Sequence, residues 1–411
     1  MSEANESRRV MERRAATPKR AGSTGGFSDT RPAPGENGGF TAVPGIVALV
    51  LIFAIFAILE PSMTHAFTFQ NILLEMGSYG FVALGVVLVL IVGEIDLSVG
   101  SIAGLGSAII GTLIQVNHYP WVLAVAIGIA AGLAIGGLQG VLVTKLRVPS
   151  FVITLGGLLS WQGVQLAVLH DTTLNVTSPA LAAFGAGVVA APVSWALAAV
   201  AVMLFALPRF NRRRNSRNGG RIPHRDVVQI VAVVVVVVGG VVFLSRGTGV
   251  PLMLWIYLTL IAAMGFVLQR TRMGRSAYAV GGNTEAARRA GFSPDFVRIV
   301  VFALSGGFAA IGGIYITGRG GTADTLTGSG SLVLVSIAAA IIGGCSLFGG
   351  RGSPWAAIVG AAVLATLIEG LNIANQGADT QLILEGFILV VAVAVDAIMR
   401  RRSAATGHGE Q

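Results

Sequence analysis

Residues 71–116 read NILLEMGSYGFVALGVVLVLIVGEIDLSVGSIAGLGSAIIGTLIQV and form one nearly unbroken apolar run of 46 residues. As a single helix this run would extend about 69 Å at about 1.5 Å per residue. The hydrocarbon core of a membrane is only about 30 Å thick. The chain must therefore turn inside the run, and residues 93–101, GEIDLSVGS, carry the glycines and polar side chains that a turn requires. We interpret the run as two membrane helices joined by this turn.

Two interpretations of the turn stay open. In the first, the motif is a turn at the membrane surface, in which glycines give the backbone its freedom and Asp96 or Ser98 caps the next helix. In the second, it is a break in a helix that lines a transport path. Under the second interpretation Glu94 and Asp96 contact substrate; under the first they only shape the turn. The candidate residues of this turn are Gly93, Glu94, Asp96, Ser98 and Gly100.

The whole chain repeats this pattern of long apolar segments. Of its 411 residues, 54% are hydrophobic and only 11% are charged, whereas a soluble domain carries about 25% charged residues. We therefore predict an all-α integral membrane protein, a polytopic bundle of about twelve transmembrane helices. The predicted spans are residues 42–60, 71–93, 99–117, 121–144, 150–170, 189–207, 226–245, 251–270, 298–317, 331–347, 353–372 and 380–399.

The basic residues predict the orientation of this bundle. With the N-terminus inside, the cytoplasmic segments hold all but two of the 28 lysines and arginines, and only Arg246 and Arg319 fall outside. Cytoplasmic loops of membrane proteins carry such an excess of positive charge. The distribution therefore predicts that both termini are cytoplasmic, which requires an even number of spans.

The segments outside the spans give the domain organisation. We expect residues 1–40 to be a disordered cytoplasmic tail, residues 41–400 to be the transmembrane domain, and residues 401–411 to be a second cytoplasmic tail. Two cytoplasmic loops interrupt the domain, at 208–225 and 271–298. The first is strongly basic, but it joins two apolar helices and lacks interleaved aromatic residues. We interpret it as an anchor for topology and expect no nucleic-acid partner.

The second loop contains GGNTEAARRAG, residues 281–291, which predicts a helix of about two turns. Asn283 or Thr284 can cap its start. A helix this short is marginal in water, so we expect a partner surface to hold it, with the small residues Ala286, Ala287 and Ala290 facing that partner. The alternative is a simple connector between two spans. The candidate residues of this docking helix are Asn283, Glu285, Ala286, Ala287, Arg288 and Gly291.

A third motif, GGCSLFGGRGS at residues 343–353, is another glycine-rich turn on the cytoplasmic side. It is not a phosphate-binding loop, because the chain contains no GxxxxGK[ST] sequence. The five histidines are scattered without an HExxH motif, and Cys345 is the single cysteine. We therefore predict no catalytic residue, no metal and no cofactor, and we expect the protein not to be an enzyme.

In this order, the three motifs resemble those of the permease subunits of bacterial ATP-binding-cassette importers for sugars, the ribose, galactose and xylose group. GEIDLSVGS is the most recognisable string of that family. A GGNxEAAR segment is its docking loop for the ATPase, and a GGTSLxGG turn is matched here with Cys345 in place of the usual threonine. The resemblance extends from about Phe69 to the C-terminus. The extra pair of spans, 189–207 and 226–245, with its basic loop resembles the xylose-type branch.

The resemblance implies a monosaccharide importer, with xylose as the expected sugar, in a bacterial cell membrane. The expected partners are a separate ATPase subunit, an external sugar-binding protein, a second permease copy and membrane lipid. An uncharged sugar needs polar and aromatic lining groups. The candidates inside the spans are Gln139, Trp161, Gln162 and Gln165, each of which serves equally well as an interhelical hydrogen-bonding residue.

Three alternatives were weighed against this prediction. The first is a permease of the same family for ribose or galactose. The second is an ion-coupled secondary transporter, for which an acidic relay in mid-span is expected. The acidic residues Glu75, Glu369, Glu385 and Asp396 instead fall near predicted span ends, where we expect water to reach them. The third is a membrane enzyme, for which no convergent catalytic group is visible.

Overall fold

The structure of the chain is a computed structural model that describes residues 42–214, 224–328 and 330–406. The predicted tail 1–40 lies outside the described residues, as do the middle of the basic loop and residues 407–411 of the predicted C-terminal tail. The helix that carries the last span continues to Thr406. The first six residues of the predicted tail, 401–406, are thus helical, and the predicted boundary at residue 401 stays a prediction.

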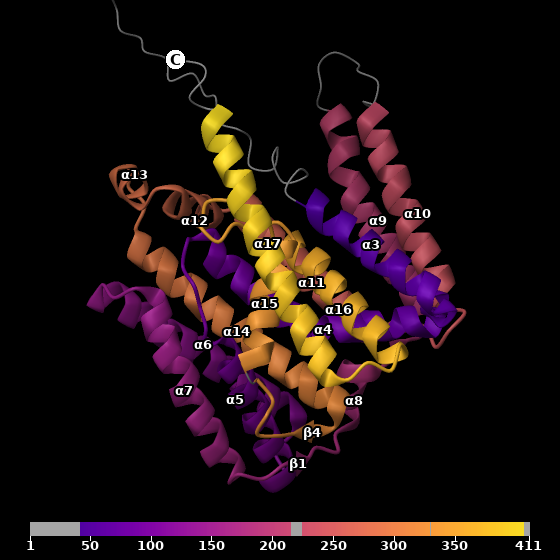
Figure 1. Cartoon of the computed structure of the whole chain (residues 1–411), viewed down its shortest axis with the longest axis horizontal. Coiled ribbons are helices and arrows are strands. Elements are labelled where there is room, and N and C mark those ends of the chain that lie inside the picture. The colour runs from indigo at the N-terminus through magenta and orange to yellow at the C-terminus, as the bar shows by residue number, and fades with distance from the viewer. Residues whose placement is uncertain (1–41, 215–223, 329, 407–411) are drawn as a thin grey trace, which may run out of the picture. The chain divides into compact units, whose positions relative to one another are not determined.

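The described chain is built almost entirely from helices (Figure 1). The long apolar helices are α3 (Val43–Leu59), α4 (Ala66–Ile91), α5 (Val99–Gly111, continued by the π-helical segment η2, Thr112–Val116), α6 (Trp121–Leu146), α7 (Ser150–Leu169), α9 (Ala191–Arg214), α10 (His224–Leu244), α11 (Leu252–Arg270), α14 (Pro294–Gly320), α15 (Gly330–Ile342), α16 (Trp355–Ile373) and α17 (Ala378–Thr406). The shorter helices are η1 (Pro61–Thr64), α8 (Pro179–Ala186), α12 (Arg272–Gly282) and α13 (Thr284–Arg289).

Each of the twelve predicted spans coincides with one of the long helices, which confirms the all-α polytopic fold. Among the described residues, nine helices are long and apolar enough to cross a membrane, and α3, α15 and the apolar part of α9 are shorter. The predicted end of the tenth span at residue 347 is wrong, because α15 stops at Ile342. Two glycines follow, and Gly344 has a φ of 103° that other residues avoid.

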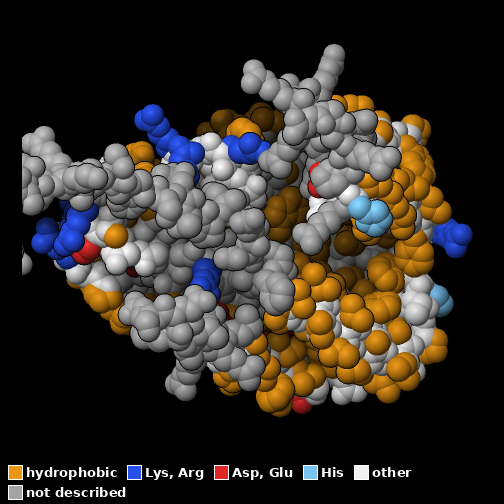
Figure 2. Space-filling view, turned by 90° about the horizontal axis from the view of Figure 1, so that it is seen from above, with side chains coloured by type: hydrophobic (Ala, Val, Ile, Leu, Met, Phe, Trp, Pro, Cys, Tyr) orange, Lys and Arg blue, Asp and Glu red, His pale blue; other side chains and the backbone are white. Residues whose placement is uncertain are grey.

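The two ends of the helix bundle differ in what they carry. In Figure 1, α12, α13 and the C-terminal end of α17 lie at one end, and α8, β1 and β4 lie at the other. Figure 2 looks onto the first end and shows lysine and arginine side chains on it. The excess of basic residues identifies this end as cytoplasmic.

Short antiparallel strands join connections at the outer end. β1 (Leu174–Asn175) pairs with β4 (Thr322–Ala323), and β2 (Val188–Val189) pairs with β3 (Val250–Pro251). The helix α8 lies between β1 and β2 in the sequence and was not predicted. Its Phe184 ring packs 5.3 Å from the Tyr315 ring of α14. The sequence signal was Ser178 followed by Pro179, a common start for a helix.

The helices form an inner group and an outer group. In the most apolar windows of α4, α5, α14 and α16, between 67% and 78% of the residues are buried. In α6, α7, α10, α11 and α17 the buried share is only 6% to 28%. The exposed side chains of the outer group are largely apolar, as expected for helices that face lipid. The inner helix α14 packs most extensively, against α4, α5 and α6.

A stripe of glycines lets α6 and α14 pack closely. Gly132, Gly136 and Gly140 lie four residues apart on α6 and face α14. A Cβ atom at Gly136 would lie 2.1 Å from the carbonyl oxygen of Phe302, and one at Gly132 would lie 2.4 Å from that of Gly306. Small residues at such contacts allow helix backbones to approach in membranes. The position of α14 therefore depends on the absence of side chains along α6.

We predict that Gly136→Leu destabilises the protein by at least about 1–3 kcal/mol, because the new side chain meets a backbone oxygen that cannot move aside. The melting temperature of the detergent-purified protein measures this effect. Gly163→Leu is the matched control, because a Cβ at Gly163 on α7 meets no atom within 4 Å. Equal melting temperatures for the two variants would contradict the prediction.

Candidate functional site

The three motifs of the sequence meet at one place on the cytoplasmic side. A Cβ atom at Gly281 would lie 1.9 Å from the carbonyl oxygen of Ile91 and 2.7 Å from the nitrogen of Gly350. A Cβ atom at Gly349 would lie 2.7 Å from the Cα of Gly93. The backbones of residues 93–101, 281–291 and 343–353 are therefore in van der Waals contact. We call this meeting point the cytoplasmic junction.

Hydrogen bonds hold the junction together. The nitrogen of Gly350 donates to the carbonyl oxygen of Ile91 over 2.9 Å, which joins the third motif to the end of α4. The hydroxyl of Tyr278 on α12 donates to the carbonyl oxygen of Gly352 over 2.8 Å. These bonds connect the end of α4, α12 and the third motif, which are far apart in the sequence. A displacement of one of them therefore strains its bonds to the others.

The turn between α4 and α5 contains a buried carboxyl group. Asp96 is only 2% exposed and Ser98 is fully buried. Asp96 Oδ1 accepts hydrogen bonds from the nitrogen and the hydroxyl of Ser98, over 3.0 and 2.6 Å, and Oδ2 accepts one from the Ser305 hydroxyl of α14 over 3.1 Å. The prediction that the side chain of Asp96 or Ser98 caps α5 is wrong, because Ser98 occupies the N-cap position without a side-chain cap hydrogen bond. The carboxylate binds the residue just before the helix and a neighbouring helix instead.

Gln139 extends this network to α6. The Ser98 hydroxyl lies 2.6 Å from Asp96 Oδ1 and 2.8 Å from Gln139 Oε1. It donates its hydrogen to one of these two oxygens and so links the amide of α6 to the carboxyl of the turn. The same amide lies against Gly157, where a Cβ would approach its nitrogen to 2.2 Å. The turn thus has α6, α7 and α14 around it.

The backbone of the same turn binds to α7. The nitrogen of Ile95 donates to the Ser150 hydroxyl over 3.1 Å, and the carbonyl oxygen of Ile95 accepts from Thr154 over 3.3 Å. Neither of these α7 residues was among the predicted site residues. Their signal was a pair of hydroxyl side chains four residues apart at the start of an apolar span, which places them on one helix face.

Glu94 forms an ion pair with α14. Its Oε1 lies 2.7 Å from Nε of Arg298, and both side chains are largely shielded from solvent, at 13% and 22% exposure. Arg298 was not among the predicted site residues. Its signal was an arginine at the boundary between the predicted loop 271–298 and the ninth span. Glu94 and Arg298 also line a polar cavity of about 520 Å³ that reaches Thr284 and Glu285 of the docking-helix motif.

The short cytoplasmic helix α13 has the predicted caps. Asn283 accepts a hydrogen bond from the nitrogen of Ala286 over 2.9 Å, and Gly291 follows the helix with a φ of 85°. Glu285 and Arg288, both exposed, lie 3.4 Å apart. The expectation that Ala287 faces a partner is wrong, because this side chain is only 3% exposed and packs into the core of the chain itself. Ala286 and Ala290 are exposed.

The four proposed path residues have different surroundings, and none of them lines the polar cavity beside Glu94 and Arg298. Gln139 belongs to the network around Asp96, and Gln165 is fully buried and donates to the carbonyl oxygens of Asp324 and Thr327 over 3.0 and 2.9 Å. Gln139 therefore joins α6 to the turn before α5, and Gln165 joins α7 to the connection between β4 and α15. Trp161 and Gln162 are half-buried on α7. The buried Nε1 of Trp161 has no hydrogen-bond partner among the described residues.

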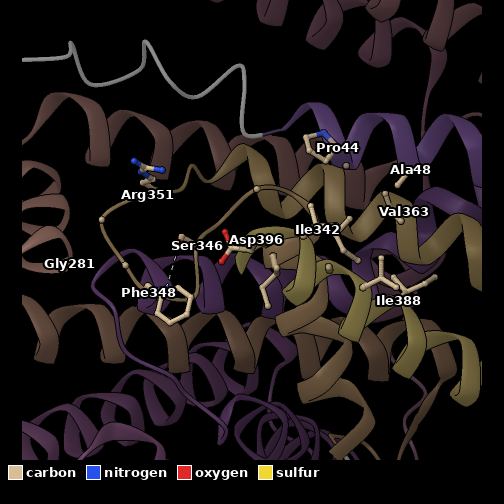
Figure 3. A pocket seen from close by; sticks show the side chains of 18 of the residues that line it. Pro44, Ala48, Gly281, Ile342, Ser346, Phe348, Arg351, Val363, Ile388 and Asp396 are labelled. Carbon is tan, nitrogen blue, oxygen red and sulfur yellow. Dashed lines mark hydrogen bonds between the residues drawn. The ribbon is translucent and has the colours of Figure 1, made fainter. Parts of the chain in front are cut away.

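A second cavity, of about 680 Å³, lies beside the junction (Figure 3). Ile342, Val363 and Ile388 line its apolar part, and Ser346 and Asp396 line it near the glycine-rich turn. Its walls are mostly hydrocarbon, whereas a sugar needs several hydrogen-bonding groups. None of the four proposed path residues lines it. We therefore do not assign it to the sugar path.

The acidic residues of the outer half have protein partners. Glu75 forms an ion pair with Arg319 of α14 over 2.5 Å, Glu369 accepts from Asn71 over 3.1 Å, and Glu385 accepts from Gln381 over 2.9 Å. The expectation that water reaches Glu369 and Glu385 is wrong, since their exposed fractions are 9% and 7%.

The fold and the junction together define a multi-pass membrane permease: lipid-facing helices surround an inner group whose breaks carry the polar residues. Residues 68–393 match the family described as branched-chain amino acid transport system / permease component, and the chain belongs to this family. Its location is accordingly a cell membrane, which it crosses several times.

Relatives in bacteria match nearly the whole chain. It is 32% identical to the xylose transport system permease protein XylH of Escherichia coli K12 over 388 residues, which cover 92% of this chain and 98% of that protein. Identity to the XylH of Haemophilus influenzae is 31%, covering 87% and 96%. Identity to the ribose import permease protein RbsC of Escherichia coli K12 is 30%, covering 85% and 92%. No solved structure matches the chain.

The environment of Asp96 makes its contribution to stability depend on pH. Burial raises the pKa of this carboxyl, and the hydrogen bonds from Ser98 and Ser305 partly oppose the rise. The folded protein therefore holds the proton more tightly than the unfolded chain does, and stability falls as the pH rises above about 4, the ordinary value for aspartate.

We predict that Asp96→Asn, which cannot titrate, gains stability relative to wild type as the pH rises from about 4 to about 8. Melting temperatures of both purified proteins across this range measure the change. Asp295→Asn, at an exposed position, controls for the loss of one carboxyl group. If the melting temperature of Asp96→Asn does not rise relative to that of wild type with increasing pH, burial does not raise the pKa of the Asp96 carboxyl.

Proposed function

We propose that this chain is the membrane-spanning permease subunit of an ATP-binding-cassette importer for a monosaccharide, xylose before other sugars. The observation that carries the proposal is the match to XylH, which spans 98% of that protein at 32% identity. The motifs around residues 93–101, 281–291 and 343–353, which resemble those of sugar permeases, supply its second support.

The choice of xylose over ribose rests on coverage. The match to XylH extends over 388 residues, whereas the match to RbsC extends over 353. The helices α9 and α10, joined by the basic loop, fit the xylose-type branch identified from the sequence. Ribose and galactose remain the alternatives within the family.

The helix α13 is the proposed contact for the ATPase subunit. It lies at the cytoplasmic end, beside the start of α14. The small side chains of Ala286, on the helix, and Ala290, directly after it, are exposed beside the charged Glu285 and Arg288. Small side chains suit docking in a groove, and the buried Ala287 attaches the helix to its own chain. Since the sequence has no GxxxxGK[ST] motif, we assign ATP hydrolysis to the partner.

The remaining partners follow from the same proposal. A sugar-binding protein would deliver its cargo to the outer end, which carries α8, β1 and β4. A second copy of the chain would complete the pathway, and lipid would cover apolar helices such as α10. We retain Trp161 and Gln162 as path candidates, because the unpaired Nε1 of Trp161 suits a sugar hydroxyl. Residues 1–40 and the end of the 401–411 segment are proposed as cytoplasmic tails.

The first test concerns the ATPase. We expect Ala286→Trp/Ala290→Trp to lose the ATPase subunit that co-purifies with the tagged wild-type protein in mild detergent, because two bulky side chains fill the docking face. Ala182→Trp is the matched control and should retain the ATPase, because it lies at an exposed position of α8, at the opposite end of the bundle from α13. Retention by the double variant would exclude α13 as the contact.

The second test concerns the sugar and the energy source. The assembled importer in liposomes should accumulate labelled xylose with internal ATP, and excess unlabelled xylose should compete better than ribose or galactose. Better competition by ribose would reassign the substrate within the family. Uptake by the chain alone, driven by a proton or sodium gradient without an ATPase, would refute the importer and favour a secondary transporter.

A further inference from the structure

Two side chains of α14 hold the turn between α4 and α5. Arg298 pairs with Glu94 over 2.7 Å, and Ser305 donates to Asp96 over 3.1 Å. Arg298 and Ser305 are seven residues apart, which is about two helical turns and places them on one face of α14. Glu94 and Asp96 alternate along a non-helical stretch and also point the same way. Both contacts therefore join one side of the stretch to one face of α14.

The opposite side of the same stretch is fixed to α7. Ile95, between the two acidic residues, uses both its nitrogen and its carbonyl oxygen to bind Ser150 and Thr154. The stretch thus lies between α7 and α14, and α5 begins at Val99, directly after it. A change in the distance between α7 and α14 must alter these bonds and with them the start of α5.

The helix α13 is attached firmly to the start of α14. The nitrogen of Phe292 donates to the carbonyl oxygen of Ala287 over 3.1 Å, and Ala287 is buried. Pro294 begins α14 only five residues after α13 ends at Arg289. Figure 1 shows α13 leading into the cytoplasmic end of α14. A partner that moves α13 consequently moves the first turns of α14, where Arg298 lies.

We propose that the two contacts of α14, Arg298 with Glu94 and Ser305 with Asp96, form a clamp that transmits movement of α13 into α5. Glu94 and Arg298 are then positioning residues that couple ATP hydrolysis to sugar movement. This inference rests on the proposed function, because it takes α13 as the ATPase contact. The ion pair suits the task, because separating two partly shielded charges costs more than separating exposed ones.

The test is the number of sugar molecules imported per ATP hydrolysed by the assembled transporter in liposomes. We expect Arg298→Gln to keep the ATPase subunit and its hydrolysis while the ratio falls about fivefold or more, the size of a typical coupling between sites. The exchange Glu94→Arg/Arg298→Glu restores an ion pair and should recover most of the ratio. Arg275→Gln, an exposed arginine on α12, is the matched control and should leave the ratio unchanged.

The outcomes separate the clamp from the proposed function. If Arg298→Gln imports sugar at the wild-type ratio, the clamp is wrong and the importer stands. If Arg298→Gln does not fold, the exchange variant decides: a folded exchange variant with a low ratio overturns the clamp, and one with a restored ratio supports it. If the wild-type protein binds no ATPase, the proposed function itself has failed.

Discussion

Polar backbone that leaves the helical conformation among apolar helices must find every hydrogen bond within the protein, because hydrocarbon offers none. The stretch between α4 and α5 meets part of this requirement through bonds to its neighbours. The carbonyl oxygens at the end of α4 accept from Gly93, Glu94 and Gly350, and Ile95 is bound on both sides by α7. The close contact of Gly281 and Gly349 with this stretch follows, since only bare backbone fits there. The junction thus supplies hydrogen-bond partners to backbone groups that the helices leave unpaired. These bonds fix the positions of the neighbouring helices.

The same helix that closes this junction also organises the bundle. α14 lies against the glycine stripe of α6, and its Gly306 faces Gly132 across that contact. Toward the outer end it carries Tyr315, whose ring packs against that of Phe184, and Arg319, which forms the ion pair with Glu75. Packing, charge pairing and the contacts to the turn therefore all depend on the position of one inner helix. This explains why most of its apolar residues are buried although its sequence has the hydropathy of a lipid-facing span.

The sequence predicted those features that depend on composition and on short-range geometry. All twelve apolar helices, the basic end and the cap of α13 by Asn283 belong to this class. The short helices α8 and α12 were missed, because neither is long enough for a span and both lie in connections. Apolar length does not indicate where a helix ends, and so α15 was placed five residues too long.

Contacts between distant residues were beyond sequence reasoning. Asp96 and Ser305 are 209 residues apart, and no period in one chain reveals that they meet. For the same reason Gln139 and Gln165 were candidates for the path, although each hydrogen-bonds to a connection between helices in this structure. Ala287 looked like part of a docking face because spacing shows which residues share a helix face but not which face turns inward.

The strand pairing at the outer end determines what kind of motion α14 can make. The segment after α7 pairs with the segment after α14 through β1 and β4, and Val176 adds a hydrogen bond to Gly321 over 2.7 Å. If this pairing holds while the cytoplasmic end of α14 is displaced, the helix tilts about its outer end. Arg298 and Ser305 lie 22 and 15 residues before Gly320, or ~33 and ~22 Å from the pivot at ~1.5 Å per residue. Any tilt therefore moves the arginine about one and a half times as far as the serine, so the ion pair opens first and the hydrogen bond to the buried carboxylate opens last.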